Sequence, residues 1–222
     1  MNALSPAPAA LLPLGRRIFA MSWPNILYSV LDAGMGVVDL WLVGRLGAEA
    51  VAGVGLSRQV YFLVMIIAVA VTAGATPLVA QASGRGDRER IGGVARQLLG
   101  MVTVLGVFSA LLLAWGARPA LILLDAPDEV QHQGRLYLMA LAPGVIFTYS
   151  NFAMVSLFRG IGQVRVPLLA AAVMHAVNLP LSYALINGLG DWLAPMGIAG
   201  AAVGTVVAQA CGMLVNLGSW YW

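Results

Sequence analysis

Six long apolar runs dominate this sequence and decide the kind of solvent in which it can fold. A helix that crosses the hydrocarbon core of a bilayer needs about 20 mainly apolar residues, and each run reaches that length. The runs cover residues 18–44, 58–82, 97–124, 136–158, 166–189 and 196–218. Only 9% of the 222 residues are charged, which is too little to cover a water-soluble domain of this size. The sequence therefore predicts an all-α polytopic membrane protein with six transmembrane helices.

The connections between the runs are too short to hold a soluble domain. We expect residues 1–16 to form a cytoplasmic N-terminal tail and residues 17–222 to form one six-helix transmembrane lobe. The tail is apolar but contains three prolines, and its arginines follow the apolar part instead of preceding it. It therefore lacks the order of a secretory signal peptide.

The basic residues, all of them arginines, indicate the orientation of the chain. Eight lie in the connections on one side of the predicted spans, and four lie in or beside the connections on the other side. Because cytoplasmic connections carry the excess of positive charge, both termini are expected in the cytoplasm. Arg58 is counted at the outer edge of the second span. These short connections lack base-reading side chains, so a nucleic-acid partner is not expected.

Two carboxylates lie inside the first apolar run. Asp39 belongs to the stretch GVVDLWLVG, and Asp32 precedes it by seven residues, which places both on one helix face. A charge at the centre of a membrane helix costs roughly 2.5 to 3.5 kcal/mol on insertion scales, so each acid needs a partner, a water-filled cavity or a proton. Asp39 is therefore a candidate functional residue, whereas Asp32 could also be a neutral, hydrogen-bonded acid.

Polar residues in the fifth and sixth runs form stripes that can face these acids. His175, Asn178 and Ser182 stand at i, i+3 and i+7, and Thr205 and Gln209 stand at i and i+4. Both spacings gather side chains on one face of a helix. Polar faces in hydrocarbon turn toward a common interior, so we expect one cavity lined by these residues and the two acids.

The same polar side chains also have structural interpretations. Asn178 and Thr205 could hydrogen-bond across packed helices, an interaction of about 0.6 kcal/mol on average. Ser182 and Gln209 fit such packing as well, and His175 could be an interior histidine whose ring nitrogens are satisfied. Structural packing does not explain a buried acid equally well, so the functional interpretation is strongest for Asp39.

The order of short motifs resembles the N-terminal half of the multidrug and toxic compound extrusion (MATE) family. Pro24 comes first, followed in chain order by GMGVVDLWLVGRLGAEAVAGVGLS, TAGATPLVAQASGRGDRE, LFRGIGQVRVP, NLPLSY and GIAGAAVGT. Small-residue helices are common in membranes, so one such motif alone is only moderately specific. Together, in this order, they extend the resemblance over nearly the whole chain.

The resemblance implies a function and a set of partners. Members of the MATE family are antiporters of two six-helix lobes, which export organic cations and other amphipathic compounds in exchange for protons or sodium ions. It therefore implies multidrug efflux in a bacterial inner membrane, surrounded by lipid. The implied partner is a second six-helix lobe or a second copy of the chain, forming a homodimer.

The resemblance also implies which residues couple transport to a cation. Asp39, Asn178 and Thr205 match the cavity site of the family, where a proton or a sodium ion would bind without any other cofactor. Their oxygens are the ligands that hard cations take. Ser182 stands where the family commonly has Asp or Asn, which leaves Asp39 as the main charge, and Asp32 has no counterpart.

Three alternatives place other demands on the sequence. A lipid flippase of the same superfamily would want a basic central cavity, whereas the arginines here lie at the edges of the spans. An intramembrane hydrolase would need a paired nucleophile and base, but the sequence has no GxSG and no HExxH motif, so an enzyme is not expected. A chain that ends at Trp222, where a second lobe should begin, could also be an inactive fragment or a half-transporter.

Overall fold

The computed structural model describes residues 14–189, 192 and 194–220, and these residues form seven α-helices and no strand. The all-α prediction is therefore confirmed for the part of the chain that is described. The helices are α1 (Leu14–Gly44), α2 (Ala48–Gly84), α3 (Arg88–Leu123), α4 (Asp128–Leu141), α5 (Gly144–Gly160), α6 (Arg165–Asn187) and α7 (Ile198–Trp220).

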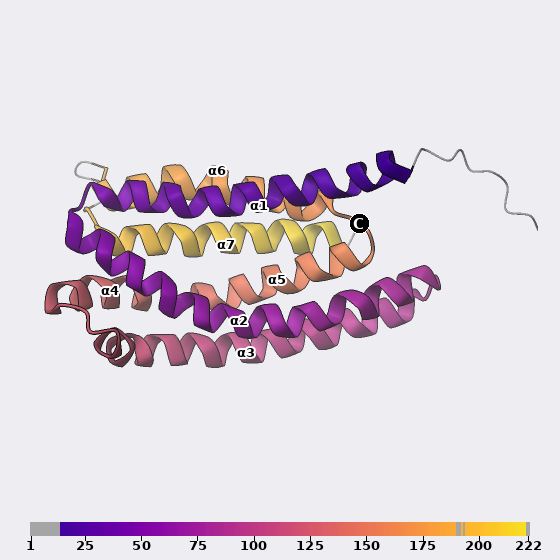
Figure 1. The fold of residues 1–222 in the computed structure, drawn as a ribbon, viewed down its shortest axis with the longest axis horizontal. Helices are drawn as coiled ribbons and strands as arrows, with labels where there is room; N and C mark the ends of the chain where they lie inside the picture. Colours follow the sequence, from indigo (N-terminus) through magenta and orange to yellow (C-terminus); the bar gives the residue numbers. More distant parts are fainter. Residues whose placement is uncertain (1–13, 190–191, 193, 221–222) are drawn as a thin grey trace, which may run out of the picture.

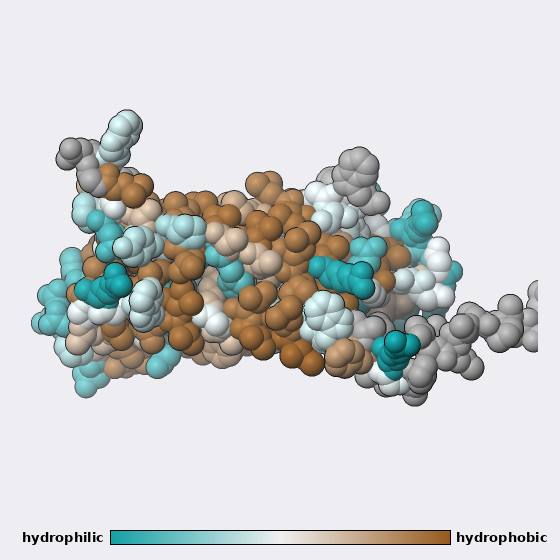
Figure 2. Space-filling view, turned by 90° about the horizontal axis from the view of Figure 1, so that it is seen from above, coloured by the Kyte–Doolittle hydropathy of each residue, from teal (hydrophilic) through white to brown (hydrophobic). Residues whose placement is uncertain are grey.

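The helices lie roughly along one axis and form an elongated bundle (Figure 1). Five of them are long and apolar enough to cross a membrane, and α4 and α5 taken together meet the same criterion as a sixth, bent span. On the face shown in Figure 2, apolar side chains cover the middle and hydrophilic side chains gather toward both ends. This distribution fits a lobe that crosses a bilayer along its long axis.

The fourth predicted span, residues 136–158, is broken, as a proline inside a membrane helix permits. Its two helices, α4 and α5, meet at a bend of 57°. Pro143 lies in the break between Leu141 and Gly144, and a proline cannot donate the backbone hydrogen bond that would continue the helix. The bend lets α4 approach α2 and α7 while α5 passes through the centre of the bundle.

Helix α5 forms the centre of the lobe because three other helices, α2, α3 and α7, pack against it. Tyr149 and Phe158 of α5 are fully buried in the main apolar cluster. The most extensive helix contact is between α6 and α7, where a Cβ on Gly200 would lie 2.6 Å from a backbone atom of Leu185. Small residues permit such approach between membrane helices. Helix α1 packs mainly on α6 and joins α2 through a short turn (Figure 1).

The connections divide the bundle into two ends. We call the end that holds Leu14, Trp220 and the α2–α3 and α5–α6 connections the terminal end, and the opposite end the loop end (Figure 1). The α2–α3 turn at the terminal end contains Gly86 with φ 71°, a conformation that glycine adopts without strain. Asp87 then caps α3 by accepting a hydrogen bond from the backbone N–H of Arg90 at 2.9 Å.

Candidate functional site

Asp39 is a buried carboxylate near the loop end of α1. Its side chain is 9% exposed, and its Oδ1 atom has no hydrogen-bond partner among the described residues. Leu42 and Val43, which follow on α1, are buried in an apolar cluster with residues of α2, α4, α6 and α7. A buried charge without a hydrogen-bond partner is strongly unfavourable, so this position favours binding of a proton or a cation.

Arg58 of α2 is the basic side chain that faces Asp39. Its Nη1 atom donates a hydrogen bond to the backbone carbonyl of Gly36 on α1, at 2.7 Å. Gly36 provides the space for this contact, because a Cβ at that position would collide with the guanidinium group. Gly36 precedes Asp39 by three residues, or about one helical turn, and Arg58 interacts electrostatically with the carboxylate.

The position of Arg58 corrects an expectation drawn from the arginine count. That count places Arg58 at the edge of the second span, but α2 begins at Ala48, so Arg58 lies about 15 Å along the helix. The apolar run in the sequence begins only after Arg58. The helix begins ten residues earlier, because the small residues that precede Arg58 are helical as well. The arginines are therefore not confined to the edges of the spans.

Tyr137 of α4 completes the surroundings of Asp39. It is 5% exposed and belongs to the same apolar cluster as Leu42 and Val43. It interacts electrostatically with both Asp39 and Arg58. Three helices that are distant in sequence thus contribute one acid, one base and one phenol to this place, and only the acid was predicted from the sequence.

Asn178 and Thr205, which were predicted to act with Asp39, contact each other across α6 and α7. Asn178 Nδ2 donates to Thr205 Oγ1 at 3.2 Å, and the threonine hydroxyl donates to the carbonyl of Ala201 at 3.1 Å. Neither bond uses the amide oxygen of Asn178. In the described residues no hydrogen bond joins this pair to Asp39, although Val38 and Asn178 line the same groove of about 350 Å³ between α1 and α6.

Ser182 and His175 lie on α6 with polar atoms that have no partner among the described residues. The hydroxyl oxygen of Ser182 is buried without a hydrogen bond and packs against Gly204, where a Cβ would collide with it. The Nε2 atom of His175 is likewise buried and unpaired, and the ring interacts electrostatically with Asp32. His175 therefore differs from a fully hydrogen-bonded interior histidine.

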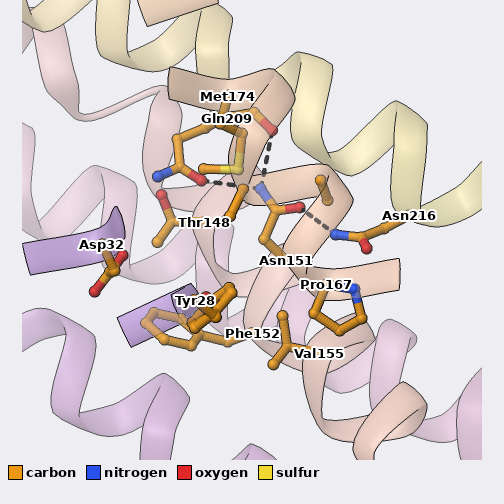
Figure 3. A pocket seen from close by; sticks show the side chains of 12 residues that line it. Tyr28, Asp32, Thr148, Asn151, Phe152, Val155, Pro167, Met174, Gln209 and Asn216 are labelled. Carbon is orange, nitrogen blue, oxygen red and sulfur yellow. Dashed lines mark hydrogen bonds between the residues drawn. The ribbon is translucent and has the colours of Figure 1, made fainter. Parts of the chain in front are cut away.

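Gln209 belongs to a second polar group, centred on Asn151 of α5 (Figure 3). Asn151 Nδ2 donates to the side-chain oxygen and to the backbone carbonyl of Gln209, both at 2.9 Å. Asn216 Nδ2 donates to Asn151 Oδ1 at 3.0 Å. One asparagine thereby holds two side chains of α7, and neither Asn151 nor Asn216 was predicted, although both interrupt apolar stretches.

This second group lines a small cavity of about 40 Å³, and Asp32 and Tyr28 of α1 form part of its wall (Figure 3). A buried water molecule needs a cavity of roughly 10 to 15 Å³ and several polar partners, so this cavity has room for water. Arg159 lies over the ring of Tyr28 at 5.3 Å, in a cation–π arrangement. Of the seven predicted residues, Asp32 and Gln209 line this cavity, and the other five lie elsewhere.

The charge inventory limits what these sites can bind. Among the described residues, no group of three or more His, Cys, Asp and Glu side chains could hold a metal ion. The arrangement around Asp39 consists of one carboxylate, the guanidinium of Arg58 and the hydroxyl group of Tyr137. The carboxylate of such a site can take up a proton or bind a monovalent cation.

Comparison with known proteins identifies similar chains. The family model MatE matches residues 24–184. The probable multidrug resistance protein NorM of Acinetobacter baylyi is 28% identical over 206 residues, covering 92% of this chain and 45% of the relative. NorM of Bradyrhizobium diazoefficiens is 31% identical, covering 88% and 40%. The multidrug resistance protein PmpM of Pseudomonas aeruginosa is 27% identical, covering 82% and 40%.

Solved structures share the fold. A crystal structure of MATE in the bent conformation superposes with a TM-score of 0.82 at 24% identity, covering 90% of this chain and 43% of that one. The outward-facing conformation of a multidrug resistance MATE family transporter of the MOP superfamily gives 0.79 at 24% identity, with 91% and 43% covered. The chain spans less than half the length of each of these relatives and structures.

Proposed function

This chain belongs to the MatE family of membrane transporters, and from that premise we propose that it is one lobe of a multidrug efflux antiporter. It is a multi-pass membrane protein of six spans. The substrates are organic cations and other amphipathic compounds. The observation that carries the proposal is Asp39, a buried carboxylate with an unpaired oxygen in a membrane helix, because ionisable residues at such positions mark ion pathways.

The transporter has a second lobe, either another six-helix unit or a second copy of this chain. Relatives named as multidrug resistance proteins are more than twice as long as the matched region. Both described ends of the chain lie at the terminal end of the bundle, so a second lobe can stand parallel to the first about an axis normal to the membrane. The substrate cavity would then lie between the lobes and open to each side in turn.

The arginine-rich terminal end faces the cytoplasm of a bacterial cell, and the lobe lies in the inner membrane. The α2–α3 and α5–α6 connections and their flanks carry Arg85, Arg88, Arg90, Arg159 and Arg165. This bias is what the positive-inside rule requires of cytoplasmic connections. Asp39 then lies in the outer half of the membrane, where a proton from outside can reach it.

A proton is the coupling ion that the surroundings of Asp39 favour. Arg58 supplies a positive charge beside the carboxylate, and this charge opposes a proton and a sodium ion alike. A proton needs only the carboxylate, whereas a sodium ion needs several oxygen ligands in the same place. Sodium binding would also want the oxygens of Asn178 and Thr205, and these form a pair of their own without a hydrogen bond to Asp39. Occupancy drives transport only if it favours one conformation of the lobes.

A lipid flippase is the related alternative, since it would use a basic central cavity. Arg58 is a basic residue inside a span, but Asp39 lies beside it and balances its charge. The site therefore lacks the net positive charge that would hold an anionic headgroup in the interior, and efflux of cations fits it better.

Transport by the purified protein tests the proposal. The chain is reconstituted into proteoliposomes, alone and with a second lobe when one is found, and uptake of the cationic dye ethidium is followed under an imposed proton or sodium gradient. We expect uptake that depends on the proton gradient and on an assembled pair of lobes. An assembled, folded pair that moves no dye under either gradient would contradict antiport, and dye transport by a strict monomer would contradict the need for a second lobe.

A further inference from the structure

A basic cleft lies between α3 and α4 near the loop end, away from Asp39. It has a volume of about 290 Å³ and is lined by Arg118 of α3 and by Asp128, Gln131, His132 and Arg135 of α4. The four α4 residues stand at i, i+3, i+4 and i+7, which places them on one helix face. Two guanidinium groups, which remain charged at every physiological pH, thus face a single carboxylate.

Neither guanidinium in this cleft is used by the described part of the chain. Arg118 and Arg135 make no hydrogen bond or ion pair with another described residue, and both side chains are exposed. Gln131 is held in place, since its Nε2 atom donates to the carbonyl of Ala126 at 2.7 Å. Two forked donors with free N–H groups can bind the oxygens of a phosphate bidentately.

The depth of the cleft matches the headgroup region of a bilayer. Arg118 lies five residues before the end of α3 and Arg135 lies seven residues after the start of α4, so both are roughly 8 to 10 Å from the loop end. Trp115, one turn before Arg118 and therefore deeper in the bilayer, is 85% exposed, and Leu111 and Phe108 on the same helix face are 55% and 63% exposed. Exposed tryptophan is typical of the membrane interface, and the exposed leucine and phenylalanine lie where acyl chains begin.

We propose that this cleft binds the phosphate of an anionic phospholipid, with Arg118 and Arg135 as the ligands of the headgroup and the exposed face of α3 as the contact for its acyl chain. The apolar surface beside the two arginines favours an anion that carries a hydrocarbon tail over a free anion from water. Paired guanidinium groups bind the oxygens of a phosphate bidentately, and their charge attracts an anionic headgroup at either surface of the bilayer. The bound lipid would fill the polar space between α3 and α4 and hold the bent fourth span against α3.

Quenching of Trp115 by brominated lipid tests the proposal in the full chain. The protein is reconstituted in phosphatidylcholine vesicles that contain a minor fraction of brominated phosphatidylglycerol or of brominated phosphatidylcholine, and the Trp115→Phe variant isolates the contribution of this tryptophan. We expect brominated phosphatidylglycerol to occupy the site beside Trp115 about ten times more readily than brominated phosphatidylcholine present at the same fraction. The double variant Arg118→Gln/Arg135→Gln should lose this preference, and the matched variant Arg88→Gln/Arg96→Gln, at the other end of α3, should keep it.

Further arms of the experiment separate the other occupants. Excess glycerol phosphate in solution should not abolish the preference, and abolition would show a site for free phosphate instead. If the Arg118→Gln/Arg135→Gln variant keeps the preference for phosphatidylglycerol, the proposal is wrong. It is also wrong if this variant keeps the lipid but no longer associates with a second lobe. Should that variant fail to fold, the wild-type preference must still weaken as salt is raised, because salt screens exposed charges, and a salt-independent preference would overturn the proposal.

Discussion

The guanidinium of Arg58 donates a hydrogen bond to the backbone carbonyl of Gly36 across 2.7 Å, and this bond ties α2 to α1 inside the membrane. It brings a positive charge to within one helical turn of Asp39 on α1. The contact depends on the missing side chain at Gly36, since a Cβ would occupy the place of the guanidinium. The bond thereby links the segment of α1 that carries Asp39 to a neighbouring helix.

Replacing Gly36→Ala should displace the flexible end of Arg58 and lower the free energy of unfolding by about 1 kcal/mol, because the guanidinium loses its hydrogen bond to the carbonyl of Gly36. Thermal unfolding in detergent measures the change. Gly34→Ala is the matched control on the same helix, because a Cβ there meets no atom within 4 Å. Equal melting temperatures for the two variants would mean that the Arg58 contact contributes nothing to stability.

Replacing Asp39→Asn should abolish ion-coupled efflux in an assembled transporter, because the amide keeps the size and polarity of the side chain but cannot ionise. Folding and membrane insertion should survive, since the neutral amide carries no buried charge and Arg58 keeps its hydrogen bond to the carbonyl of Gly36. Dye transport in proteoliposomes under an imposed gradient measures the effect, with Asp125→Asn in the α3–α4 connection as the control. Uphill export at the native rate by the Asp39→Asn protein would make Asp39 a structural acid. Asp32→Asn should have a milder effect.

Replacing Arg58→Gln should change which ion drives transport. Without the guanidinium, the carboxylate binds any cation more readily, and the amide oxygen of the glutamine is a further ligand that a sodium ion uses and a proton does not need. We expect transport driven by a sodium gradient to rise relative to transport driven by a proton gradient. Arg58→Lys keeps the positive charge and should keep the native ratio. If the ratio is the same in all three proteins, Arg58 does not select the coupling ion.

Replacing Asn151→Ala should destabilise the lobe by about 1 to 3 kcal/mol, because the change leaves Asn216 and Gln209 without their partner in a buried region. Unfolding in detergent again gives the magnitude. Asn187→Ala is the control, since Asn187 is exposed and bonds only to the carbonyl of Tyr183 one turn earlier on its own helix. A loss no larger than that of the control would show that water replaces the Asn151 amide.

The predicted orientation can be tested by cysteine labelling in cells, starting from a Cys211→Ser background. A cysteine at Asp125, in the α3–α4 connection, should react with an impermeant maleimide added from outside. A cysteine at Arg85, in the α2–α3 connection, should react only after the membrane is opened. Both positions are exposed. The reverse pattern would place the termini outside and contradict the arginine count.

The sequence by itself determined that the chain is an all-α membrane lobe, and it identified Asp39 as a residue of interest. Both conclusions depend on local properties. A helix in lipid satisfies its own backbone hydrogen bonds, so its existence follows from an apolar run of sufficient length. A charge in such a run is unfavourable whatever its neighbours are, so Asp39 stands out without knowledge of any partner.

Only the tertiary structure decided which side chains meet. The guanidinium and the phenol that interact electrostatically with Asp39 come from α2 and α4. Asn151 joins α5 to α7, and Gln209 lies in the cavity with Asn151 and Asp32 and not beside Asn178. Helical spacing predicts which residues lie on the same face of one helix. Contacts between helices depend also on how each helix is rotated and bent and on how closely its neighbour packs. Those variables are set by close contacts at Gly36 and Gly204 and by the break at Pro143, whose effects appear only when the helices pack together.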